Sequence, residues 1–273
     1  MDIRPSTELS DTEKLLRHAL QTRKAAEECM WANIFNSAIK GNEWFKDQAV
    51  EPAGGAANYT YLYYIFRALN DMHPRRILEF GLGQSTRLVS QYAAFYKDSH
   101  ALIVEQSREW YESFRHKFDE SNTEMVFLEA ASREMTDAEK EHVLKVCAEN
   151  RHFVFSEGLP KVFPDYSYYV DIENNQRLLS EKYDLVLIDA PGPLNWRQEV
   201  FGRRDILSLT GNLADEFVIL IHDTDRYAQL VLASDLIDIL EKERQVELSY
   251  YTKMGFKSTT VIASPKYAYL VTS

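Results

Sequence analysis

The 273-residue sequence lacks several features that would place it in a familiar class at once. It has two cysteines, Cys29 and Cys147, too few for a disulfide framework and not spaced as zinc ligands. Its 31 lysines and arginines are outnumbered by 42 aspartates and glutamates, which gives a net charge of -11. Because nucleic-acid phosphates are bound by basic surfaces, we expect no nucleic-acid partner. The few cysteines favour a reducing, cytoplasmic location.

The sequence also has no apolar stretch as long as a membrane span, and no internal repeat. Residues 1–5 lack the basic start and apolar core of a signal peptide. Apolar residues make up 45% of the chain and charged residues 27%, as in ordinary globular proteins. We therefore expect no membrane partner, and one large domain with at most a modest extension.

Helical spacing of apolar residues predicts a first helix from Ser10–Asp11 to Ile39. Residues 51–58, rich in glycine and alanine, form the clearest loop, so we divide the chain into an N-terminal helical extension, 1–58, and a main domain, 59–273. The extension could cap the active site or form a homodimer, but a helix packed on the flank of the domain is the simpler interpretation.

In the main domain, short apolar runs alternate with helical patterns, which predicts an α/β fold with a doubly wound, mostly parallel sheet. A helix is expected at 59–70, with one or two of its tyrosines near a substrate cleft, and Trp110, Phe114 and Phe118 are expected in the core. Residues 160–171 are a candidate lid. The predicted strands lie near 77–78, 101–104, 125–128, 183–188, 216–221, 246–251, 259–263 and 267–271.

The stretch Arg75–Arg87 has the most informative pattern. A buried strand ends at Glu79, Gly81 and Gly83 form a tight turn, and Ser85–Thr86 open a helix. Such a turn lets a ligand approach bare backbone, with positive φ expected at Gly83, and the helix start offers N–H groups to an anion. The dinucleotide fingerprint G-x-G-x-x-G is incomplete, because Thr86 stands where the third glycine would be.

Charged side chains follow three further predicted strands. Glu105 ends the second strand, where a carboxylate can accept hydrogen bonds from both ribose hydroxyls. Asp189 ends the strand at 183–188, and His222 and Asp223 end the strand at 216–221. Ligands bind at the carboxyl ends of strands in open α/β folds, so these side chains are site candidates.

The spacing Glu79-x-Gly81-x-Gly83-x-Ser85 resembles the first motif of class I S-adenosylmethionine-dependent methyltransferases, with serine in the last place. The resemblance covers most of 59–273 and implies a Rossmann-like sheet whose C-terminal edge is antiparallel. It implies that S-adenosylmethionine is the cofactor, bound by Glu79, Gly81, Gly83, Gln84, Ser85, Thr86, Glu105 and Asp189. The endings I-D-A-P-G and I-H-D-T resemble small-molecule O-methyltransferases, which implies a hydroxylated small molecule as acceptor.

Some of those enzymes hold a divalent cation between an Asp after the fourth strand and an Asp-Asn pair after the fifth. Asp189 matches the first ligand, but His222–Asp223 replaces the pair, so a Mg²⁺ site on Asp189 and Asp223 stays open. Without a metal, His222 or Asp189 would take the proton of the attacking hydroxyl. The alternatives are a non-catalytic methyltransferase-like binding protein and an NAD-dependent oxidoreductase, which would lack its third glycine and a Tyr-x-x-x-Lys pair.

Overall fold

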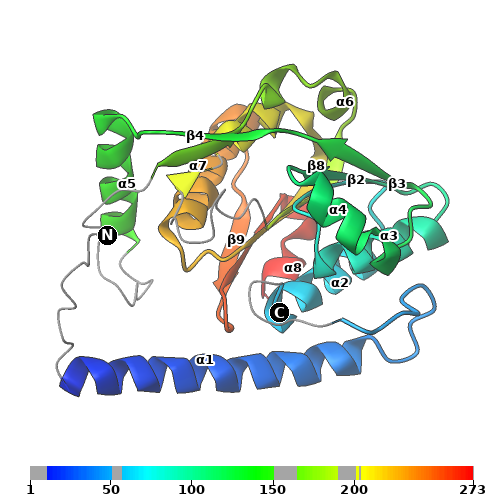
Figure 1. The fold of residues 1–273 in the computed structure, drawn as a ribbon, viewed down its shortest axis with the longest axis horizontal. Coiled ribbons are helices and arrows are strands. Elements are labelled where there is room, and N and C mark those ends of the chain that lie inside the picture. The colour runs from blue at the N-terminus through cyan, green and yellow to red at the C-terminus, as the bar shows by residue number, and fades with distance from the viewer. Residues whose placement is uncertain (1–10, 51–56, 151–164, 190–200, 203, 273) are drawn as a thin grey trace.

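The computed structural model describes residues 11–50, 57–150, 165–189, 201–202 and 204–272. Helices and strands alternate along this part of the chain (Figure 1). The helices are α1 (Asp11–Ala38), α2 (Tyr59–Met72), α3 (Gln84–Phe95), α4 (Arg108–Phe114), α5 (Asp137–Glu149), α6 (Gln176–Leu179), α7 (Tyr227–Arg244) and α8 (Tyr269–Thr272), with 3-10 segments η1 (Arg115–Lys117), η2 (Ile172–Asn174), η3 (Arg204–Asn212) and η4 (Pro265–Tyr267). The strands are β1 (Arg76–Phe80), β2 (His100–Glu105), β3 (Thr123–Phe127), β4 (Ala130–Arg133), β5 (Tyr166–Tyr169), β6 (Tyr183–Ile188), β7 (Phe201–Gly202), β8 (Leu213–His222), β9 (Ser249–Lys253) and β10 (Thr259–Ala263).

Seven of the described strands form one sheet in the order β3-β2-β1-β6-β8-β10-β9. The first five pair in parallel, β10 is antiparallel to β8, and β9 is antiparallel to β10. This confirms the predicted doubly wound, Rossmann-like sheet with an antiparallel C-terminal edge. Because β1, β6 and β8 are parallel neighbours, their carboxyl ends lie at one edge of the sheet, where ligands bind in such folds.

The apolar runs form strands because helices cover the sheet on both faces. Successive side chains of a strand point to opposite faces, so Leu185 and Leu187 join the core under α1, α2 and α3, whereas Val186 and Ile188 join the core under α7. These two cores fix the register of the central strands. They thereby fix which residue stands at each carboxyl end.

The C-terminal half of α1 shares the first of these cores. Phe35 is fully buried there with Tyr61 and Leu62 of α2, whereas Leu15 and Leu16 near the start of α1 are 70% and 60% exposed. In Figure 1, α1 runs along one side of the molecule below the other elements. The division of the chain at residue 58 stays a prediction, but apolar side chains from both sides of it pack together.

Two expectations about single elements are wrong. Residues 267–271 are not a strand: Pro265 opens the 3-10 segment η4, and α8 then buries Leu270 and Val271 in the core. A short apolar run fits either period, and tertiary burial decided between them. Trp110 was expected in the core, but its side chain is 46% exposed, while Phe114 is buried as expected.

A second sheet was not predicted. β4 pairs with β5 in antiparallel fashion, and β5 pairs with β7 in parallel. Part of the segment predicted as a lid is therefore strand β5, and residues 151–164 lie outside the described part of the chain. In the described part, no helix is both long and apolar enough to cross a membrane.

Candidate active site

The glycine turn links the carboxyl end of β1 to the start of α3. Gly81 has a positive φ of 99°, a conformation that favours glycine. Gly83 does not: its φ is -169°, which is extended backbone, so the positive φ expected there is wrong. A Cβ added at Gly83 would meet nothing within 4 Å, so open space lies beside this residue at the helix N-terminus. The Gly83 N–H donates to Thr86 Oγ1 at 3.0 Å.

Glu79 lies behind this turn with its side chain completely buried. Neither carboxyl oxygen has a hydrogen-bond partner among the described residues, and the nearby Ser85 hydroxyl is equally unpartnered. Burial is the largest effect on the pKa of Glu79, which is raised to about 8. The Ser85 and Thr86 hydroxyls lower this pKa, although they form no hydrogen bonds of normal geometry to the carboxyl group, and the charge of Asp189 raises it further. A buried acid that lacks partners is expensive to ionise and is suited to receive a cationic ligand.

Glu105 ends β2 and is only 3% exposed. Its carboxylate accepts hydrogen bonds from three backbone N–H groups, those of Leu82 (3.1 Å), Gln106 (2.9 Å) and Ser107 (2.7 Å). Glu105 therefore ties the glycine turn to the end of β2. Trp110 covers the same turn and donates from its indole nitrogen to the Leu82 carbonyl at 2.7 Å. The role of Glu105 in ribose binding stays a prediction.

Asp189 and His222 meet at the ends of β6 and β8. His222 Nδ1 lies 2.5 Å from Asp189 Oδ1, and Nε2 lies 3.1 Å from Asn58 Oδ1. The Tyr61 ring stacks on the imidazole at a centroid distance of 4.6 Å, and His222 is 1% exposed. The second oxygen of Asp189 makes no hydrogen bond to the described residues.

Asp223 is placed differently from its two neighbours at this sheet edge. It has a positive φ of 60°, and its carboxylate is paired with Arg226 at 3.2 Å and Lys257 at 3.5 Å. Two cationic side chains thus lie against Oδ2 of Asp223, and Oδ1 of Asp189 is engaged by His222. No group of three His, Cys, Asp or Glu side chains in the described ranges could hold a metal ion. The described residues do not fit the Mg²⁺ site.

Tyr61 is a site residue that sequence reasoning did not single out. Its side chain is fully buried and its hydroxyl has no partner among the described residues. Burial first, then the charges of Asp189 and Glu79, raise the pKa of Tyr61. The helix predicted at 59–70 contained the signal, but it has five aromatic residues and nothing in the sequence distinguished Tyr61 from the other four.

The remaining predicted residues, Gln84, Ser85 and Thr86, form the first turn of α3 and are 8%, 1% and 0% exposed. The structure therefore brings the glycine turn, Glu79 and Asp189 together at one edge, with His222 behind Asp189. Asp223 follows His222 in the sequence, but its carboxylate is paired with Lys257 and Arg226 and not with this group.

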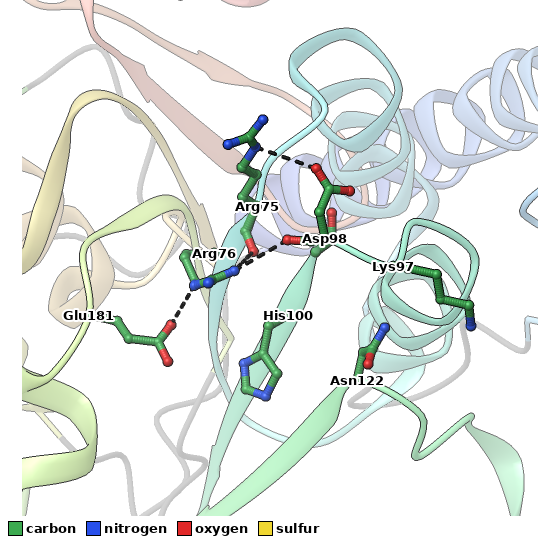
Figure 2. Close-up of a pocket in the computed structure, with 8 residues that line it drawn as sticks. Arg75, Arg76, Lys97, Asp98, His100, Asn122 and Glu181 are labelled. Atoms are coloured by element: carbon green, nitrogen blue, oxygen red, sulfur yellow. Dashed lines mark hydrogen bonds and ion pairs between the residues drawn. The ribbon is translucent and has the colours of Figure 1, made fainter.

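A cavity of about 480 Å³ lies at the opposite, amino-terminal end of the strands (Figure 2). Arg75 and Arg76 line it, but Arg75 is paired with Asp98 and Arg76 with Glu181. Figure 2 shows these pairs converging around His100 at the start of β2. The charged side chains of this cavity largely neutralise one another, and they lie away from the carboxyl ends of the strands. The cavity therefore does not belong to the candidate site.

No family model matches the sequence, and no curated protein matches it. Solved structures are similar in fold. The O-methyltransferase TomG from Streptomyces achromogenes, in complex with SAM, is 12% identical with a TM-score of 0.46, over 87% of this chain and 98% of its own. The O-methyltransferase from Bacillus cereus, in complex with SAH, is 12% identical with a TM-score of 0.43, over 87% and 90%. A spermidine synthase with a transition-state analogue is 12% identical with a TM-score of 0.40, over 76% and 62%.

Glu79 should make the ligand-free protein less stable as the pH rises. Its pKa is raised from 4.5 to about 8, so the folded chain keeps a proton that the unfolded chain releases. This contribution is complete below about pH 4.5 and is lost as the pH rises through about 8. The total loss is about 5 kcal/mol at 1.4 kcal/mol per pKa unit, and most of it falls between about pH 5 and pH 8. Urea unfolding at about pH 5 and pH 8 measures it, with Glu79→Gln as the variant that cannot ionise. An equal loss in both proteins would contradict the assignment.

Proposed function

We propose that this protein is an S-adenosylmethionine-dependent methyltransferase that methylates a hydroxyl group of a small molecule. The observation that carries the proposal is the buried, unpartnered carboxyl group of Glu79 beside the open space at Gly83. When bound, the cofactor supplies a methyl group on a positively charged sulfonium. The groups proposed to hold it are Glu79, the turn at Gly81 and Gly83, the first turn of α3 (Gln84, Ser85, Thr86), Glu105 and Asp189.

The charge of the site favours this cofactor over a dinucleotide. The pyrophosphate of NAD is anionic and would meet Glu79 at the turn. Arg87, the nearest basic residue of α3, is directed away: its guanidinium donates to the Asp47 carboxylate and the Ala49 carbonyl, each at 2.5 Å. The site therefore has a buried acid beside the turn, where the pyrophosphate of a dinucleotide would lie, and Arg87 does not offset its charge.

Asp189 and His222, at the ends of β6 and β8, provide a group that can take the proton of the substrate hydroxyl. The nitrogen atoms of His222 are both engaged, whereas the second oxygen of Asp189 accepts no hydrogen bond from the described residues. We therefore assign Asp189 as the group that takes the hydroxyl proton while the oxygen gains the methyl group, with His222 as its hydrogen-bond partner. The described residues do not fit a metal, so we assign no step to one. A binding protein without activity would share the cofactor site, and turnover separates the two.

Gly83→Ala tests the cofactor site. Its methyl group would enter the open space beside the turn, and the extended φ of Gly83 puts no strain on an alanine. We expect an unchanged melting temperature and a loss of S-adenosylhomocysteine affinity of about tenfold or more, equivalent to ~1.4 kcal/mol. Isothermal titration calorimetry measures the affinity. Gly211→Ala, where an added Cβ also meets nothing within 4 Å, is the matched control and should bind as wild type. Wild-type affinity in Gly83→Ala would exclude this turn as the site.

Asp189→Asn tests the chemistry. Removing the proposed proton acceptor should lower kcat roughly 10²–10⁴-fold, while a competent cofactor site still binds S-adenosylhomocysteine. Methyl transfer to a panel of phenols, sugars and hydroxy acids supplies the assay. Because Asp223 is occupied by Arg226 and Lys257, we expect exhaustive chelation to leave the wild-type rate unchanged. Turnover that stops with chelator and returns with Mg²⁺ would overturn the metal-free assignment.

A further inference from the structure

The middle of α1 reaches the candidate site through one carboxylate. Glu28 Oε1 accepts a hydrogen bond from the Tyr59 N–H at 2.7 Å. Its Oε2 accepts from Asn58 Nδ2 at 3.1 Å and from the Phe256 N–H at 3.3 Å. All three partners are donors, so a carboxylate satisfies them and an amide would not. Glu28 therefore joins α1 to the start of α2 and to the loop between β9 and β10.

Asn58 links Glu28 to His222 at the end of β8. It caps α2 by accepting from the Tyr61 N–H at 3.3 Å, and it is 4% exposed. Its Nδ2 donates to Glu28 and, at 2.9 Å, to the Lys257 carbonyl. Because both nearby acceptors face the nitrogen, the orientation of the amide is determined, and Oδ1 is the atom that faces His222.

The orientation of Asn58 determines what His222 does. Oδ1 can only accept, so His222 Nε2 carries a hydrogen and donates it. One further proton lies between Nδ1 and Asp189 Oδ1 at 2.5 Å. With both nitrogens engaged and the Tyr61 ring stacked on its face, the imidazole is fixed in place. A fixed imidazole in turn fixes the carboxylate of Asp189.

Other contacts keep α1 on the same loop. Trp31 donates from its indole nitrogen to the Met254 carbonyl of this loop at 2.8 Å. Lys24 is paired at 2.9 Å with Asp225, which follows β8 and accepts a hydrogen bond from the Ser258 N–H of the loop at 3.1 Å. The loop packs tightly against α2, since a Cβ added at Gly255 would lie 2.1 Å from Thr60 Oγ1. Figure 1 shows α1 passing beneath the ends of α2 and β9. The N-terminal helix is thereby held at the site along its middle section.

We propose that Glu28 and Asn58 are positioning residues, which act through His222 to hold the Asp189 carboxylate in place for proton transfer. The proposal rests on the proposed function for the role of Asp189, but the hydrogen-bond chain itself does not depend on it. It gives the N-terminal helix a part in the active site: α1 supplies Glu28, whose carboxylate orients the first link of the chain. Of the groups proposed to hold the cofactor, Asp189 alone belongs to this hydrogen-bond chain, whereas Glu79 and the glycine turn come from the end of β1 and the turn before α3. We therefore expect the hydrogen-bond chain to affect turnover much more than cofactor affinity.

The first measurement is made without cofactor or substrate. The proton between His222 Nδ1 and Asp189 should give a strongly downfield proton resonance, assigned by its loss in His222→Gln. Asn58→Ser keeps a good helix cap but is too short to reach His222, and Glu28→Gln places an amide against donors. We expect the resonance to shift or broaden in both variants. Glu27→Gln, the neighbouring residue that pairs with Arg23 on α1 at 2.8 Å, should leave it unchanged.

The second measurement uses turnover. We expect Asn58→Ser and Glu28→Gln to lower kcat about tenfold or more, with S-adenosylhomocysteine affinity within about twofold of wild type, and Glu28→Asp to recover part of the rate. An unchanged resonance in both variants, or the same change in Glu27→Gln, would overturn the proposal. So would a loss of cofactor affinity equal to the loss of kcat. If wild type binds no cofactor and methylates nothing, the proposed function fails, and the resonance still decides the hydrogen-bond chain.

Discussion

An unpartnered acid inside the protein, Glu79 at the end of β1, is the constraint on which the rest of the site depends. Its burial follows from the fold, because β1 lies in the middle of the sheet with α2 and α3 packed over its end. Burial raises the pKa of Glu79 to about 8, so the ligand-free protein holds it protonated near neutral pH. A cationic ligand offsets the cost of ionising this group, and the open backbone at Gly83 gives such a ligand access. Binding and protonation are therefore coupled at this site.

The hydrogen bonds of Asp189 and His222 depend on residues that lie outside the sheet. Asp189 and His222 end strands of the central sheet, but Asn58 and Glu28 come from the start of α2 and from α1. The same α1 side chains also hold the loop after β9. With Asp189 as the proposed proton acceptor, this arrangement would place part of the catalytic geometry under the control of the N-terminal helix. Phe35 in the second half of α1 is fully buried, whereas Leu15 and Leu16 near its start are exposed.

The sequence predicted the sheet and the strand ends well, because an apolar run ending in a charged residue marks the point where a buried strand reaches solvent. Glu79, Glu105 and Asp189 were found in this way. What each of them binds could not be predicted, since their partners depend on tertiary packing: Glu105 on the backbone of two turns, and Asp223 on Lys257, which is distant in sequence. The second sheet was missed for the same reason, because β4, β5 and β7 come from three separate segments.

The central claim is that Glu79 releases its proton when the cationic cofactor binds. Calorimetry of S-adenosylmethionine binding near pH 7, in buffers with different ionisation enthalpies, counts that proton directly. With its pKa at about 8, Glu79 is largely protonated at this pH. The account predicts that wild type releases roughly one proton per cofactor bound and that Glu79→Gln releases none. A wild-type binding enthalpy that is the same in every buffer would contradict it.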